Sequence, residues 1–186
     1  MYGLIHTALR EMVVEHHGRS VWNSIVDESG VSDNAFLTMR VYEDATTQTL
    51  VDVASKVLNL PAEDCLEIFG EYWTHDFAPR EYAQLMDYTG QSFFEFLDNL
   101  NDLHDRIATA FTDFSPPGFR LEVVDDTSAW VHYFSSRKSL TPFVVGLLKG
   151  LGDRFGQKVT VETVKTVSSD TGENSSIFVR VEGHNV

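Results

Sequence analysis

The fold is decided by residues 92–114, which read SFFEFLDNLNDLHDRIATAFTDF and are followed by Ser115-Pro116-Pro117-Gly118. Ser92 and Glu95 have the spacing of a capping box, in which the two side chains satisfy each other's free backbone amides at a helix start. Apolar residues then recur every three or four positions, which predicts one long helix over 92–114. The resulting stripe contains a single histidine; its members are Phe93, Leu97, Leu100, His104, Ile107, Phe111 and Phe114.

The sequence before this stretch has helical patterning. An amphipathic opening helix precedes Gly18, and a short second helix ends near Gly30, because glycine is favoured just after a helix end. Apolar positions over 50–58 indicate a third helix, and Pro61 stands where the first residue of a fourth helix belongs. The front of the chain is therefore expected to be helical.

Beyond Pro116-Pro117 the apolar period changes to two, which is typical of strands. The elements that this predicts are strands 119–124 and 128–136, a helix that begins at Thr141-Pro142, and strands 158–164 and 176–181 joined by a polar loop over 168–174. The order β-β-α-β-β after a helical front indicates an α+β fold.

Composition excludes several classes of protein. The 186 residues include 42% hydrophobic and 12% aromatic side chains, so a folded core is expected. The 28 acidic and 14 basic residues give a net charge of -14, which disfavours nucleic acids and anionic membranes as partners. Cys65 is the single cysteine, which excludes an intramolecular disulfide and a cysteine-rich zinc site. With no signal-peptide core and no apolar run of about 20 residues, a cytoplasmic location is expected.

His104 occupies a core-facing position among large apolar residues. A buried imidazole needs a partner, because an unpaired buried polar group costs about 1–3 kcal/mol. One interpretation is a core histidine bonded to a backbone carbonyl, and the other is a metal ligand. Because no cysteine, second histidine or carboxylate stands at zinc spacing on the same face, the metal that fits best is haem iron, to which the porphyrin supplies the other four ligands.

A row of hydrogen-bond donors follows on the second predicted strand. Tyr133, Ser135 and Arg137 share one face, since alternate side chains of a strand point the same way. Alone, this row reads as a solvated strand face, but it also suits a carboxylate or phosphate, which Arg137 can bind through two nitrogens. Pro116-Pro117 ends the helix, and it can also serve as a rigid wedge against a flat ligand.

These features together resemble the bacterial haem–nitric oxide/oxygen-binding (H-NOX) domains, especially the cyanobacterial ones, which are relatives of the haem domain of soluble guanylate cyclase. The resemblance covers essentially the whole chain. The matching motifs, in family order and spacing, are Met1-Tyr2-Gly3, Gly70-Glu71-Tyr72-Trp73, Leu103-His104, Pro116-Pro117 and Tyr133-x-Ser135-x-Arg137.

The resemblance implies a single domain over 1–186, with a helical N-terminal lobe, 1–60, and a larger lobe, 61–186, that bears a four-stranded antiparallel sheet over 118–183. Haem b, with ferrous iron, is expected between the lobes. By position, the family's roles fall as follows: His104 is the proximal iron ligand; Tyr133, Ser135 and Arg137 bind the propionates; Pro117, next to Pro116, packs on the porphyrin and bends it; and Ile5, Leu9, Trp73, Phe77 and Phe143 line the distal, gas-binding side.

The resemblance also implies a sensor for NO and CO. Oxygen-binding members resemble one another in having a distal tyrosine five residues after the motif's arginine, and here that position is Pro142. Without an O–H donor, bound O₂ loses a stabilising contact, whereas NO and CO depend on one much less. Trp73 carries an indole N–H that is also able to donate, besides packing on the haem edge.

The expected signal is release of the bond between iron and His104, followed by a shift of the N-terminal lobe. With no catalytic domain expected on the chain, the output acts in trans, on a histidine kinase or cyclic-nucleotide enzyme. No nucleophile–base pair or carboxylate pair indicates an enzyme. The alternative is a haem-free binding module in which Arg137 and Tyr133 hold the carboxylate of an apolar ligand and His104 is a core histidine.

Overall fold

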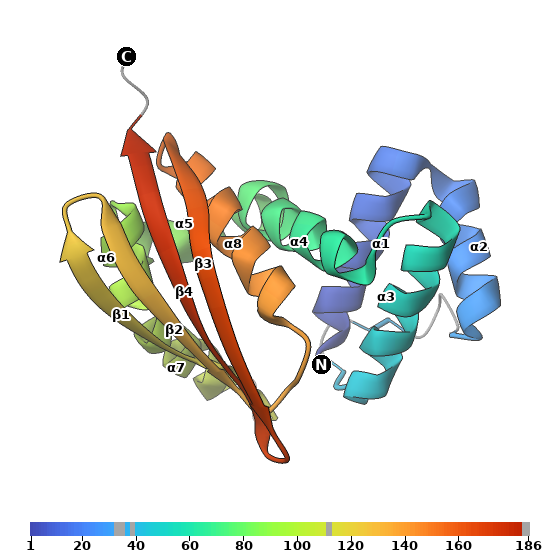
Figure 1. The fold of residues 1–186 in the computed structure, drawn as a ribbon. Helices are drawn as coiled ribbons and strands as arrows, with labels where there is room; N and C mark the ends of the chain where they lie inside the picture. The colour runs from blue at the N-terminus through green and yellow to red at the C-terminus, as the bar shows by residue number, and fades with distance from the viewer. Residues whose placement is uncertain (32–35, 38–39, 111–112, 184–186) are drawn as a thin grey trace. The chain divides into compact units, whose positions relative to one another are not determined.

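The computed structural model describes residues 1–31, 36–37, 40–110 and 113–183. Its helices and strands, shown in Figure 1, divide into two compact units, Met1–Phe69 and Gly70–Val186. The fold is α+β, as the sequence predicts, with helices first and the strands in the second half. The predicted lobe boundary stands at 60/61, and the boundary between the compact units falls later, inside a helix.

The first unit is built from helices whose ends the sequence marks well. They are α1 (Gly3–His17), α2 (Arg19–Ser29), α3 (Asp44–Leu58) and the first part of α4 (Ala62–Tyr72). Gly18 and Gly30 follow the first two helices with φ of 87° and 67°, in the region that glycine adopts without strain. Ala8, Trp22, Ile25 and Leu50 are fully buried and form part of the apolar core.

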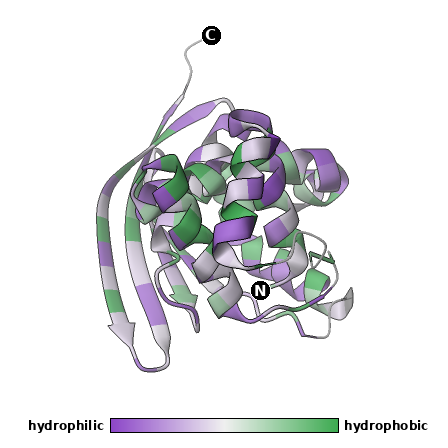
Figure 2. Ribbon diagram, turned by 90° about the vertical axis from the view of Figure 1, so that its right-hand side faces the viewer, coloured by the Kyte–Doolittle hydropathy of each residue, from purple (hydrophilic) through white to green (hydrophobic). Residues whose placement is uncertain are grey.

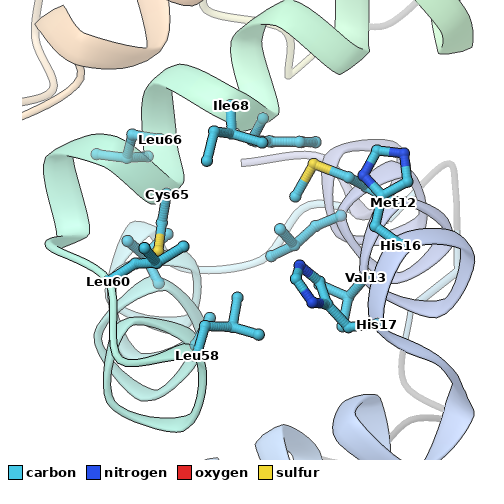
Figure 3. Close-up of a pocket in the computed structure, with 13 residues that line it drawn as sticks. Met12, Val13, His16, His17, Leu58, Leu60, Cys65, Leu66 and Ile68 are labelled. Atoms are coloured by element: carbon cyan, nitrogen blue, oxygen red, sulfur yellow. The ribbon is translucent and has the colours of Figure 1, made fainter.

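A small apolar pocket lies within this unit (Figure 3). Leu60 and Cys65 form one side of it, and Met12, Val13 and His17 of α1 stand opposite. Burial raises the pKa of the Cys65 thiol, with a smaller contribution from Asp64. Cys65 is a buried free cysteine, and its raised pKa disfavours the reactive thiolate form.

The predicted long helix over 92–114 is two helices, which corrects the sequence prediction. α6 (Phe93–Asp98) ends at Asn99, and α7 (Leu100–Ala110) follows. At the break, the Asn99 side chain donates a hydrogen bond of 2.8 Å to the carbonyl of Thr89, outside its own helix. The stripe member Phe111 lies outside the described residues.

The predicted capping box is confirmed in one half. The Ser92 hydroxyl accepts a hydrogen bond from the Glu95 amide at 3.3 Å. The carboxylate of Glu95 accepts from the amide of Gln91 at 2.9 Å, one residue before the expected partner. Both contacts still satisfy backbone donors at the start of α6, where no helical acceptor is available.

The second unit carries a four-stranded antiparallel sheet in the order β1-β2-β4-β3. Its strands are β1 (Gly118–Asp125), β2 (Ser128–Ser135), β3 (Gln157–Ser169) and β4 (Gly172–Gly183). Figure 2 shows hydrophobic and hydrophilic residues interspersed along the strands. The inward residues, such as Val131 and Ile177, form one core with α6, with α5 (Ala78–Thr89) and with α8 (Thr141–Arg154).

The prediction of a polar loop over 168–174 is wrong. β3 continues to Ser169 and β4 begins at Gly172, so a tight turn joins them. The strand pattern was missed because this end of β3 is exposed on both faces and therefore carries no alternation of apolar and polar residues. The correction places Glu173 within a strand.

Helix α8 packs closely on a π-helix from an earlier part of the chain. The π-helix η2 (Trp73–Phe77) bears Thr74, whose hydroxyl donates to the carbonyl of Leu147 on α8 at 3.1 Å. A Cβ at Gly150 would lie 2.4 Å from that hydroxyl oxygen, so only glycine permits the approach. None of the described helices is long and apolar enough to cross a membrane.

The stability of the first unit should fall with acid because of His6. His6 is 0% exposed, and its Nε2 lies 2.8 Å from the hydroxyl of Thr47. Burial, with a smaller effect of the N-terminal ammonium, lowers the pKa of His6 to about 4. The unfolded chain takes up this proton near pH 6.5, so the stabilisation is complete above that pH and is lost as pH falls to about 4.

The expected loss across this window is about 3 kcal/mol, measured by urea unfolding at a series of pH values. His6→Gln should flatten this dependence, whatever its effect on stability at pH 7. His17→Gln, at an exposed position on the same helix, should leave it unchanged. An unaltered pH dependence in His6→Gln would contradict the assignment.

Candidate functional site

His104 lies half-buried on α7 in an aromatic environment, as its position in the apolar stripe predicts. Its ring centroid is 6.0 Å from those of Phe114 and Phe119. Among the described residues, no group satisfies its buried Nδ1 with good hydrogen-bond geometry. The Pro117 carbonyl acts on the ring as a hydrogen-bond acceptor, an arrangement that can orient a ligating histidine through its second nitrogen.

The electrostatics of the site keep the imidazole neutral. Burial lowers the pKa of His104 below its ordinary value, and the nearby carbonyl of Pro117 and the carboxylate of Asp105 offset this only in part. A neutral imidazole has a lone pair available, which is the form that binds a metal. The ring is therefore suited to metal ligation at neutral pH.

Helix α7 lies beside the sheet (Figure 1). A pair of hydrogen bonds joins them: the side-chain amide of Asn101 donates to the carbonyl of Phe119 at 2.6 Å, and its oxygen accepts from the Phe119 amide at 2.9 Å. Asn101 lies one helical turn before His104, so the contact sets the position of the imidazole relative to β1.

Tyr133 lies on β2 directly opposite Phe119, and the two ring centroids are 5.5 Å apart. The Phe119 ring thus stands between His104 and Tyr133. Tyr133 is 2% exposed, and burial raises its pKa, against the effect of a hydrogen bond with Ser135. Its phenol therefore stays protonated and keeps a proton to donate.

Arg137 does not continue the strand face as expected, because β2 ends at Ser135 and a turn follows. The Ser135 hydroxyl accepts from the Arg137 amide at 3.0 Å, which closes this turn. The Arg137 guanidinium then donates to the carbonyl of Ser115 at 2.9 Å. This contact brings the arginine to the segment that contains Pro116 and Pro117.

The segment 115–119 thus collects the predicted residues of the second unit. Its carbonyl at Ser115 binds Arg137, Pro117 lies beside His104, and Phe119 packs against both rings. The structure brings an imidazole, a phenol, a hydroxyl and a guanidinium around one short stretch of chain. This set can supply a metal ligand on one side and anion-binding donors on the other.

Comparison with known proteins identifies the family to which the chain belongs. A family profile described as Haem-NO-binding matches residues 2–163, most of the chain. The chain belongs to the haem–NO-binding family.

Its structural relatives are H-NOX proteins. An H-NOX protein from S. oneidensis in the Fe(II)NO state has a TM-score of 0.85 and 22% identity, with 98% of this chain and 100% of that one covered. The unliganded Fe(II) H-NOX protein from K. algicida has a TM-score of 0.83 and 18% identity, with 100% and 99% covered. At these identities the likeness shows the fold.

Its curated relatives are soluble guanylate cyclases. The protein gcy-32 of Caenorhabditis elegans is 29% identical over 99% of this chain, and 89Da of Drosophila melanogaster is 21% identical over 98%. The H-NOX domain spans 27% and 28% of their lengths, so the match is confined to about a quarter of each cyclase. The H-NOX family is a family of haem-based gas sensors, and H-NOX domains bind haem.

The residues of this H-NOX domain fit a haem. The site presents a neutral imidazole within an aromatic setting that suits a flat apolar ring. Tyr133, Ser135 and Arg137 supply donors of the kind that carboxylates bind. The donor set matches both ends of the cofactor, the iron and the propionates.

The residues predicted for the distal side are divided between the units. Ile5 and Leu9 lie on α1 in the first unit, and Leu9 contributes there to the apolar pocket. In the second unit, Trp73 and Phe77 stack on each other within η2, with centroids 5.0 Å apart. Phe143, half-buried, lies in the first turn of α8.

Sequence reasoning missed two residues that support the site. Asn101 reads as a surface position on a helix, and its bonds to Phe119 join residues 18 positions apart. Glu173 falls in the stretch expected to be a loop, yet it is 5% exposed and acts electrostatically on Tyr133. A buried glutamate beside a predicted site was not foreseeable without the strand pairing.

Replacement of Asn101 should loosen α7. Asn101→Ala removes both bonds to Phe119, and the free energy of unfolding of the apoprotein should fall by about 2 kcal/mol, about 1 for each bond. The measurement is urea denaturation followed by circular dichroism. Asp102→Asn, the exposed neighbour on the same helix, is the control and should change stability little. Equal stabilities would show that the pair is not structurally important.

Proposed function

We propose that this H-NOX domain is a gas sensor that binds NO, and also CO, at the ferrous iron of haem b, with His104 as the proximal ligand. The observation that carries the proposal is the half-buried His104 ring, which burial keeps neutral and which packs on two phenylalanine rings next to the Pro117 carbonyl. When bound, the haem supplies an iron atom that binds diatomic gases.

Tyr133, Ser135 and Arg137 would hold the propionates. The turn closed between Ser135 and Arg137 and the bond from Arg137 to Ser115 place these donors without help from a ligand. A preformed set of donors binds an anion with less loss of conformational entropy than a mobile one. Pro117, which lies beside His104, would press on the porphyrin from the same side.

Pro142 supports selectivity for NO over O₂. It occupies the first turn of α8, where oxygen-binding members of the family are expected to carry tyrosine. A pyrrolidine ring has no proton to donate, so this position offers no hydrogen bond to bound O₂. NO and CO lose little by this, because their binding depends less on such a donor.

His104 would also carry the signal. A protein of this kind switches when a ligand binds one of two states better than the other. Release of His104 from the iron would free the imidazole and relax the contact at Pro117, within a helix that Asn101 anchors to the sheet. The change would be read by a separate signalling protein, such as a histidine kinase or a cyclic-nucleotide enzyme.

Removal of the ligand tests the proposal directly. His104→Gly should abolish stable haem binding, and about 10 mM imidazole should restore it by filling the space with the missing ligand. The measurement is the Soret absorption of the reduced protein after haem supplementation. His17→Gly, at an exposed position, should bind haem like the unaltered chain. Absence of a Soret band in the unaltered chain would favour the haem-free carboxylate-binding module instead.

Gas selectivity is tested at Pro142. The ferrous protein should form NO and CO complexes and no stable O₂ complex in air. Pro142→Tyr should yield an O₂ complex, while Pro142→Phe should not, because the two rings differ by the donating hydroxyl. Absorption spectra under each gas provide the measurement. A stable O₂ complex of the unaltered chain would reject the selectivity but keep the haem.

A further inference from the structure

A buried carboxylate lies behind the turn that bears Arg137. Glu173 is 5% exposed, near the start of β4, and pairs in the sheet register with Ser135. Its Oε2 accepts from the Ser139 amide at 3.0 Å, and its Oε1 accepts from the Thr141 hydroxyl at 2.5 Å. A buried charge is costly unless it is hydrogen-bonded, so these contacts are strongly favoured.

The backbone around Glu173 is held in conformations that need support. Ser139 has a φ of 63°, in the left-handed region, which costs a non-glycine residue of the order of 1 kcal/mol. The contact of its amide with Glu173 holds it there. Gly172 has a φ of 149°, and a Cβ on it would lie 2.0 Å from the carbonyl oxygen of Ser135. The turn and the start of β4 are therefore fitted to each other.

The second contact of Glu173 leads into α8. Thr141 is the first residue of that helix and 7% exposed, and its hydroxyl serves Glu173 rather than capping the helix. The same hydroxyl lies 2.7 Å from that of Ser175 on β4. Pro142 and Phe143 follow Thr141 directly in the same first turn, and Thr74 joins the middle of α8 to η2. The carboxylate thus connects the Arg137 turn with α8 and, through it, with η2.

We propose that Glu173 is a positioning residue that ties the propionate-binding turn to the first turn of α8, so that the two move together. This role rests on the proposed haem function. If haem binds, the turn that holds the propionates and the first turn of α8, with Pro142 and Phe143, are both hydrogen-bonded to Glu173. A rearrangement of the turn is then transmitted to α8 through two hydrogen bonds to one carboxylate.

The tie is tested at Thr141. Thr141→Val keeps the shape of the side chain and removes the hydroxyl, whereas Thr141→Ser keeps the hydroxyl. Amide hydrogen exchange is measured with and without haem. In the unaltered chain and in Thr141→Ser, haem should slow exchange at both Ser139 and Val144. In Thr141→Val, it should still slow Ser139, while the effect at Val144 falls about tenfold. An undiminished effect at Val144 in Thr141→Val would overturn the proposal.

A second pair of variants separates positioning from general stability. Glu173→Gln removes the charge and one acceptor, and haem transfer to excess apomyoglobin should become about tenfold faster, since the turn loses one of its bonds. Glu122→Gln makes the same change at an exposed position of β1 and should leave the rate unchanged. The thermal midpoint of each apoprotein is measured in parallel. A Glu173→Gln rate equal to that of the unaltered chain would count against the proposal.

Failure of the haem function gives a different result. If the unaltered chain takes up no haem, the proposed function is rejected, and the tie is judged on the apoprotein. There, Thr141→Val should accelerate exchange at Ser139 together with Val144, and acceleration confined to Val144 would refute the tie.

Discussion

The two hydrogen bonds between the Asn101 side chain and the backbone of Phe119 join the helical and the sheet parts of the second unit. They attach α7, which bears His104, to β1, whose Phe119 is paired with Tyr133. The Phe119 ring also contacts the rings of His104 and Tyr133, so the clamp fixes the helix against the residue on which both rings pack. The position of the imidazole relative to the phenol depends on this contact.

Two polar side chains lie partly or fully buried in the second unit, where apolar side chains are usual. His104 has an imidazole nitrogen for which no described group offers a hydrogen bond of good geometry, and Glu173 has a carboxylate that accepts two hydrogen bonds. Burial keeps the imidazole neutral, which is the form that binds a metal. The carboxylate stabilises a strained turn. The contrast separates a group prepared for binding from a group that holds its neighbours in place.

Several features could be predicted because they depend on residues close together in the chain. The period of apolar residues identified the helices of the first unit and the strands that follow Pro116-Pro117. The hydrogen bond from the Asn99 side chain could not be predicted, because its acceptor, the carbonyl of Thr89, lies outside the helix. The strands around Gly172 were missed because that end of the sheet is exposed and polar, so its pairing leaves no periodic trace.

The sequence by itself determined the α+β class, the core-facing place of His104 and the shared motif of Tyr133, Ser135 and Arg137. These follow from periodicity and from spacing within single elements. The tertiary structure decided which partners those residues have: Phe119 for Asn101, Ser115 for Arg137, and Ser139 and Thr141 for Glu173. Such pairs join separate elements, and a hydrogen bond between them exists only after strand register and helix packing have brought the atoms within reach.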